Sequence, residues 1–198
     1  MINGTNENTK VMPRRKTNLE LRDREYLTPQ EMEQLLAVTK KLGRQGFRNY
    51  CMLFLGYRHG LRNTELCNLK WSDIDLGAGT ILVRRLKGSE SGIHPLGREE
   101  IRVLLKLRKQ YPEGQYVFQL QNGAPMTETC FRQIVKRAGI AAGLPFPIHP
   151  HMLRHSCGFY LIQKADFRSV QQWLGHRQMQ STVRYTVLTP DRFRGLWD

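Results

Sequence analysis

The residues best suited to chemistry lie near the end of the chain and are basic or aromatic. They are two imidazoles, a guanidinium and a phenol: His151, Arg154, His176 and Tyr185. A reacting phosphodiester gathers negative charge, and an arginine can donate to two of its non-bridging oxygens at once. None of the four side chains is a carboxylate. The set therefore predicts phosphoryl transfer, with Tyr185 as the nucleophile.

The charge balance independently predicts a polyanionic partner. The chain carries 31 Lys and Arg against 17 Asp and Glu, a net charge of +14 on 198 residues, and its pI is about 10.1. Nucleic acid is the favoured partner. An anionic membrane surface is the alternative, but the basic residues are spread through apparently folded segments and no amphipathic helix dominates.

The composition favours one compact domain inside the cell. The length and the 40% hydrophobic content suit a single core. The longest apolar run, Cys51 to Leu55, is too short to span a membrane, and the polar N-terminal end lacks a signal-peptide core. We therefore expect a cytoplasmic protein. The cysteines show no paired spacing and are expected to be reduced core thiols: Cys51, Cys67, Cys130 and Cys157.

Two regions are expected along the chain. Residues 1–25 form a basic, flexible arm with few apolar anchors, and residues 26–198 form the catalytic domain. The arm is expected to bind DNA through Lys10, Arg14, Arg15 and Lys16. The alternative is a solvated tail without a role.

Most of the expected elements are helices. Thr28 and Glu31 have capping-box spacing, with Pro29 at the first helical position, and predict a helix to about Leu42. Glycine-rich turns between short apolar runs predict a small antiparallel sheet of three strands. The fold class is thus α+β, mainly α-helical. The other helices are expected at about 47–59, 64–69, 99–110, 127–142, 150–163 and 167–174, the strands at 74–76, 80–85 and 93–96, and a turn or helix from 181.

Two further candidates precede the C-terminal set. Thr64 is predicted to cap the short helix, which places Arg62 beside a helix N-terminus and Glu65 in its first turn. Lys87 lies at the edge of a Gly-rich turn, where a loop can reach a ligand without disturbing the core.

Taken in order, these segments resemble the tyrosine recombinase (phage integrase) family from Tyr26 to Trp197. The similar boxes are Gly60-Leu-Arg62-Asn-Thr-Glu65-Leu66, the turn lysine Lys87, His151 to Arg154, Leu174 to His176, and Tyr185. His149 to His155 and Arg192 to Trp197 are most similar to the small recombinases that invert fimbrial promoter elements. The chain differs in Asn63-Thr64, where an apolar-small pair is usual, and in lacking the separate core-binding domain of larger relatives.

The resemblance implies a role for each residue. Arg62 and Arg154 would clamp the scissile phosphate, with His176 as a further donor. Lys87 would protonate the leaving 5′ oxygen, and His151 would accept or relay the proton of Tyr185. Glu65 and His155 would support these groups, and Arg84 and Arg85 would contact DNA beside Lys87. No metal or cofactor is needed, because the phosphotyrosyl link conserves the bond energy.

The implied activity is inversion of a promoter segment between inverted repeats on double-stranded DNA. Two duplexes require four protomers, so we expect a homotetramer on DNA, with possible accessory DNA-bending proteins and no membrane partner. Four alternatives stay open: an integrase or excisionase, a non-catalytic DNA-binding regulator of the same fold, a type IB topoisomerase, and a zinc site at His149, His151 and His155.

Overall fold

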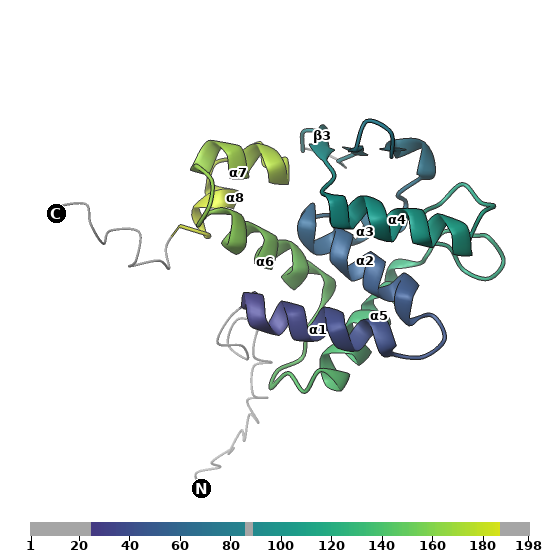
Figure 1. Ribbon diagram of the computed structural model, residues 1–198. Coiled ribbons are helices and arrows are strands. Elements are labelled where there is room, and N and C mark those ends of the chain that lie inside the picture. The colour runs from purple at the N-terminus through teal and green to yellow at the C-terminus, as the bar shows by residue number, and fades with distance from the viewer. Residues whose placement is uncertain (1–24, 86–88, 187–198) are drawn as a thin grey trace, which may run out of the picture.

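A computed structural model describes residues 25–85 and 89–186 of the chain. Helix α2 (Gly46–Arg58) is central, and its most extensive helix contacts are with α1 (Pro29–Lys41), α6 (Pro150–Leu161) and α4 (Arg98–Gln110). Figure 1 shows α6, α7 (Phe167–Leu174) and α8 (Gln180–Val183) gathered on one side of the molecule. The remaining helices, α3 (Asn63–Cys67) and α5 (Glu128–Ala141), pack against each other next to α2. This arrangement confirms a mainly α-helical fold.

The start of the first helix follows its capping sequence. The Glu31 carboxylate accepts from the Thr28 N–H at 2.8 Å, and the Thr28 hydroxyl accepts from the Glu31 N–H at 3.3 Å. Two orphan donors are thus satisfied, and the predicted capping box is confirmed. Further along the chain, α2 is followed by Gly60 at φ +57°, a left-handed conformation that glycine adopts without strain. This turn carries the chain to Arg62.

A small antiparallel sheet follows α3 and a short 3₁₀ turn, Trp71–Asp73. Strand β2 (Thr80–Val83) lies between β1 (Ile74–Asp75) and β3 (Gly92–Pro95), and Ile81 faces Ile74 on one side and His94 on the other. Ile81 and Val83 are buried in the core, so alternate residues of β2 fix the register. The predicted three-stranded sheet is confirmed.

The predicted cap of α3 is wrong. The helix begins at Asn63, and Arg62 occupies the N-cap position, where its N–H donates to the Glu65 carboxylate at 2.8 Å. Because Glu65 already satisfies this end of the helix, the Thr64 hydroxyl is free to donate to the Glu128 carboxylate of α5 at 2.6 Å. The two polar residues after Arg62 therefore connect α3 to α5: Asn63 also donates to Glu128, at 3.2 Å.

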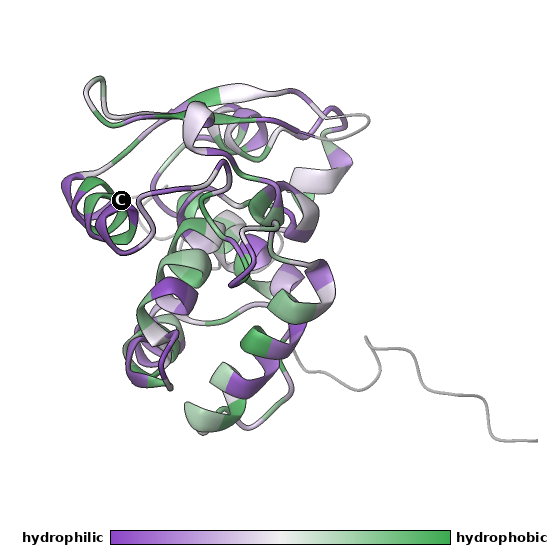
Figure 2. Cartoon of the chain, turned by 90° about the vertical axis from the view of Figure 1, so that its right-hand side faces the viewer, coloured by the Kyte–Doolittle hydropathy of each residue, from purple (hydrophilic) through white to green (hydrophobic). Residues whose placement is uncertain are grey.

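Most of the large hydrophobic side chains in the described residues are buried, although Ile93 and Ile140 are each 70% exposed. Figure 2 shows hydrophobic and hydrophilic residues on different sides of the helices, as expected when one face of each helix is buried. The four cysteines are free thiols, and Cys51, Cys67 and Cys157 are buried. Within the described segments, no helix combines the length and the apolarity needed to cross a membrane.

Candidate active site

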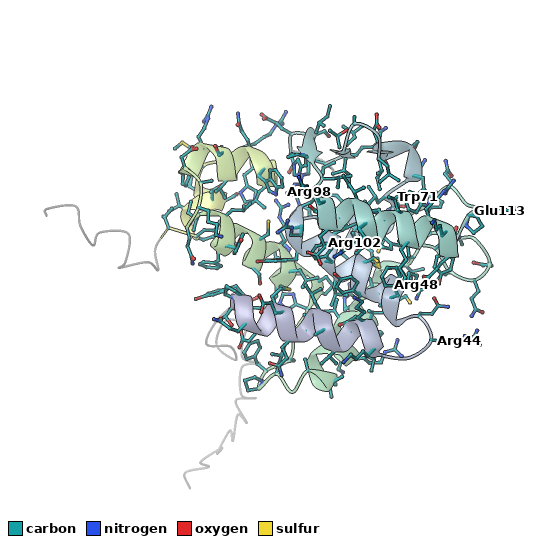
Figure 3. The ribbon with its side chains drawn as sticks, viewed as in Figure 1. Arg44, Arg48, Trp71, Arg98, Arg102 and Glu113 are labelled. Atoms are coloured by element: carbon teal, nitrogen blue, oxygen red, sulfur yellow. The ribbon has the colours of Figure 1, made fainter. Side chains whose placement is uncertain are left out.

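The C-terminal candidate catalytic residues and Arg62 line one pocket of about 180 Å³. Its walls come from the start of α3, from α6 and from the segment around α8. A larger hollow of about 560 Å³ lies beside the sheet and contains Trp71, which Figure 3 shows on the side of the molecule away from α6 to α8. The predicted residues, not the size of the cavity, identify the small pocket as the site. It is lined by Arg62, His151, Arg154, His155, His176, Ser181, Arg184 and Tyr185.

Arg154 is held rigidly at the base of the pocket. Its residue is 2% exposed, and its guanidinium donates to the carbonyl of Gly60 and, at 2.7 Å, to that of Leu174. Burial and then the charges of Arg85 and Arg62 lower the pKa of Arg154 to about 10, so it stays protonated at pH 7. A fixed cation is what a developing phosphorane requires.

Arg62 forms an ion pair with Glu65, which lies three residues later in α3. Its Nη1 donates to Glu65 Oε1 at 2.7 Å and its Nη2 to Ser89 Oγ at 2.8 Å, while the side chain stays 32% exposed. Burial acts to raise the pKa of Glu65, but the bonds to Arg85 and Arg62 outweigh it and hold the pKa below its usual value. Glu65 is therefore a carboxylate that orients Arg62.

Tyr185 is buried against α6 with its phenol in the pocket. The residue is 2% exposed, and its Oη lies 3.0 Å from Nδ1 of His155. Gly158 makes the seat for its ring, because a Cβ there would lie 2.6 Å from Cζ of Tyr185. Burial raises the pKa of Tyr185 above its ordinary value, and the charge of Arg154 acts in the opposite direction. With its pKa raised in this way, the phenol of Tyr185 would need a base to lose its proton at neutral pH.

His176 is oriented by the short helix α8. Its Nδ1 lies 2.8 Å from the hydroxyl of buried Thr182, and its carbonyl accepts from Gln171 Nε2 at 2.9 Å. With Nδ1 engaged, Nε2 is left for a substrate oxygen. Burial and then Arg154 lower the pKa of His176 to about 3, so the ring is neutral at pH 7 and donates from one nitrogen only.

The other two pocket histidines contact each other edge to face. The rings of His151 and His155 are 4.4 Å apart between centroids. Burial and then the charge of His151 lower the pKa of His155 to about 3. Partial burial and then Arg154 lower that of His151 to about 4, although His151 is exposed, so solvent weakens the effect there. The phenol hydrogen bond thus goes to His155, and His151 lies one ring further out.

The basic residues expected beside Lys87 differ in exposure. The Arg84 side chain is 67% exposed and pairs with Asp73 at 2.7 Å. Arg85 was expected to face DNA, but its side chain is 1% exposed and pairs with Glu65 at 2.7 Å. The correction has a physical cause, since alternate residues leaving β2 point to opposite faces. Lys87 and the arm residues Lys10, Arg14, Arg15 and Lys16 lie outside the described residues.

The histidines of the zinc alternative have other partners. His149 lies 3.1 Å from the carboxylate of Glu25, and His155 bonds to Tyr185. In residues 25–85 and 89–186, no three metal-ligating side chains come together.

Three residues that support the site were not predicted. Thr182 orients His176, Gly158 seats Tyr185, and Ser89 bonds Arg62 and pairs with His176 through a backbone bridge. Thr182 precedes Tyr185 by three residues, a spacing that places both on one side of a helical turn. Nothing in the sequence distinguishes Gly158 or Ser89 from other small residues.

This fold, with arginines and a histidine around a buried tyrosine, is that of a tyrosine recombinase catalytic domain. Residues 25–192 match the Phage integrase family, and the chain belongs to that family. Among curated proteins, it is 42% identical to the type 1 fimbriae regulatory protein FimB of Escherichia coli K12. That match covers 92% of this chain and 94% of FimB. It is also 38% identical to FimE of the same strain, over 88% of this chain and 91% of FimE.

Solved structures of larger recombinases share the fold. The XerH site-specific recombinase, bound to its difH substrate in a pre-cleavage complex, is 28% identical with a TM-score of 0.72. The match covers 88% of this chain but 53% of XerH, so the chain spans about half the length of that protein.

Proposed function

We propose that this recombinase inverts a DNA segment by cutting and rejoining strands through a 3′-phosphotyrosyl intermediate at Tyr185. The proposal rests on one observation: Tyr185 lines the same pocket as Arg62, Arg154 and His176. The reaction forms a bond from Tyr185 Oη to phosphorus and breaks the bond to the 5′ oxygen. That oxygen leaves as a hydroxyl, and the reverse reaction rejoins a strand.

The two arginines and His176 bind the scissile phosphate. Arg62 is partly exposed and reaches the substrate first, whereas Arg154 is fixed by carbonyls behind it. Together they stabilise the charge of the pentacoordinate transition state. His176 adds a neutral N–H donor. No cofactor or metal takes part.

The phenol needs a route for its proton. A free phenol with a pKa of about 10 is only about 0.1% ionised at pH 7, a handicap of roughly 4 kcal/mol. The proton passes to His155 Nδ1, which lies 3.0 Å away, and His151 relays it to solvent at the pocket rim. An arriving phosphate would raise the low pKa values of both rings, because its charge offsets that of the arginines.

The leaving oxygen takes its proton from Lys87. The residues on either side support this role, since Arg85 contacts Glu65 and Ser89 contacts Arg62. Lys87→Ala should cleave an ordinary phosphodiester slowly but should recover on a 5′-bridging phosphorothiolate, whose thiolate leaves unprotonated. Arg154→Ala should stay slow on both substrates. Equal recovery of the two variants would refute this division of roles.

The biological substrate we propose is a fimbrial promoter element between inverted repeats. FimB and FimE are by name regulators of type 1 fimbriae, and XerH is a site-specific recombinase bound to DNA. Four protomers would assemble on two duplexes, with accessory DNA-bending proteins at the nucleoid in the cytoplasm. Residues 1–25 and Arg84 would contact phosphates outside the pocket of the 26–198 catalytic domain.

A nicked suicide half-site tests the chemistry, and a plasmid with two inverted repeats tests the outcome. The wild-type protein should become linked to the 3′ phosphate and should invert the plasmid segment. Tyr185→Phe should bind the half-site normally without forming the adduct. An adduct with Tyr185→Phe would assign another nucleophile. Binding without any wild-type adduct would indicate a non-catalytic regulator, relaxation without inversion a topoisomerase, and exchange only between separate molecules an integrase.

A further inference from the structure

A second buried arginine lies directly behind the pocket. Arg85 follows strand β2, and its side chain is 1% exposed, as is that of its partner Glu65. Its Nη1 donates to Glu65 Oε2 at 2.7 Å and to the Gly60 carbonyl at 3.1 Å. Burying a charge is costly unless its hydrogen bonds are complete. The two contacts of Nη1 supply part of that compensation.

Two helix ends complete its environment. The Nη2 of Arg85 donates to the carbonyl of His59 at 3.2 Å and to that of Trp173 at 2.7 Å. These carbonyls belong to the C-terminal ends of α2 and α7, where carbonyls lack helical partners and the helix dipole is negative. Arg154 bridges the same two ends one residue further on, at Gly60 and Leu174.

Gly175 lets the arginine approach the end of α7. It has a φ of +64°, and a Cβ there would lie 3.1 Å from Nε of Arg85 and 2.6 Å from the Glu90 carbonyl. The backbone immediately before His176 therefore packs directly on Arg85.

Glu65 lies between two cations. Its Oε1 accepts from Arg62 Nη1 and its Oε2 from Arg85 Nη1, each at 2.7 Å. One carboxylate shared by two guanidiniums leaves one unit of positive charge on the trio. Without Arg85, the charge of the Glu65 carboxylate, whose side chain is 1% exposed, would be balanced by Arg62 alone.

We propose that Arg85 is a positioning residue that acts through Glu65. Arg85 balances most of the negative charge of the Glu65 carboxylate, so that the positive charge of Arg62 remains available for the scissile phosphate. The proposal rests on the phosphate-binding role proposed for Arg62. It also explains why a residue beside the turn lysine is buried rather than directed at DNA.

The test compares two substrates in single-turnover cleavage with DNA saturated by protein. One half-site carries an ordinary scissile phosphodiester. The other carries a methylphosphonate, in which a methyl group replaces one charged oxygen and less positive charge is needed. Arg85→Met should slow cleavage of the phosphodiester on the order of 10²-fold, the typical cost of losing one transition-state donor. On the methylphosphonate its rate should approach that of the wild type.

Two more variants separate charge from packing. Glu65→Gln/Arg85→Met removes both charges and should cleave the phosphodiester faster than Arg85→Met alone. Arg85→Lys keeps a cation for Glu65 but cannot reach all the carbonyls, so its cleavage rate should stay close to that of the wild type even if its melting temperature falls. This variant keeps the test valid if Arg85→Met does not fold.

Arg48→Met is the matched control. Arg48 is also buried, donates to the Gln119 carbonyl at 3.1 Å, and lies at the end of α2 away from α6 to α8 (Figure 3). Its loss should lower stability without changing the cleavage rate. The proposal fails if Arg85→Met slows both substrates equally, if the double variant is no faster, or if a folded Arg85→Lys is as slow as Arg85→Met. A wild-type protein that forms no adduct would instead refute the proposed function.

Discussion

The phenol of Tyr185 hydrogen-bonds to Nδ1 of His155, at 3.0 Å, rather than to a ring of the more exposed His151. The proposed nucleophile, Tyr185, is thus paired with a neutral acceptor from α6, one residue after Arg154. This pairing gives His155 a more direct place in the proton route than its sequence position indicates.

The first prediction concerns this hydrogen bond. His155→Gln can still bond the phenol but cannot accept its proton, so cleavage at pH 7 should fall on the order of 10²-fold. The rate should recover as the pH rises, because hydroxide can then remove the proton. Half-site binding should be unchanged. A pH-rate profile parallel to that of the wild type would show that His155 has no part in proton transfer.

The second prediction concerns the seat of the tyrosine. In Gly158→Ala, the new methyl would lie 2.6 to 2.9 Å from three ring carbons of Tyr185. Displacing the ring should cost about 1–3 kcal/mol and should abolish the covalent adduct, while the half-site is still bound. Urea unfolding and adduct formation measure the two effects. Normal adduct formation would mean that Tyr185 leaves this seat before it reacts.

The third prediction concerns the orientation of His176. Thr182→Val keeps the shape of the side chain but removes the hydroxyl that lies 2.8 Å from Nδ1, which should lower stability by about 1 kcal/mol. Cleavage should fall on the order of 10-fold, because the ring loses its fixed direction. Thr186→Val is the control, since that hydroxyl bonds an exposed backbone carbonyl on the same segment. Equal effects of the two variants would contradict the role of Thr182.

The fourth prediction concerns acid stability. The pKa of His155 is lowered to about 3 in the folded chain, chiefly by burial, against about 6.5 when unfolded. Between these values only the unfolded chain binds the proton, so the stabilisation is present above pH 6.5 and is lost as the pH falls. The free energy of unfolding should therefore decrease by up to about 1.4 kcal/mol per pH unit for this histidine.

Urea unfolding at several pH values between 7 and 4.5 measures this slope. His155→Gln should show a shallower decline than the wild type, because it lacks the titrating ring, whereas the other histidines titrate in both proteins. Identical slopes would place the ring in a more hydrated environment than its burial indicates.

The fifth prediction concerns the basic arm. Removing residues 1–18 should flatten the salt dependence of DNA binding, each lost phosphate contact reducing the log-log slope by about 0.9. Preference for the specific site should survive, since backbone contacts carry no sequence information. If affinity and slope both stay unchanged, the arm is a solvated tail.

Local signals in the sequence were enough to predict most elements. The capping box at Thr28, the glycines that end α2 and α7, and the Gly-rich turns of the sheet each specify structure within a few residues. Ser181 and Arg184 also line the pocket but were not predicted, whereas the other pocket residues were predicted because their order resembles the motifs of the family. Arg84 and Arg85 show what the sequence could not predict, since nothing local distinguishes two adjacent arginines. Only the direction in which β2 meets α3 and α7 decides which of them is buried.

The bond from Arg154 to the Gly60 carbonyl joins residues that are 94 positions apart in the chain. A recombinase should not cleave DNA before its active site is complete. A chain in which α6 has not yet packed against α2 has no assembled pocket, even when all of its reactive side chains have been synthesised. Strand cleavage is thus restricted to the folded protein, because the pocket exists only when these distant segments have come together.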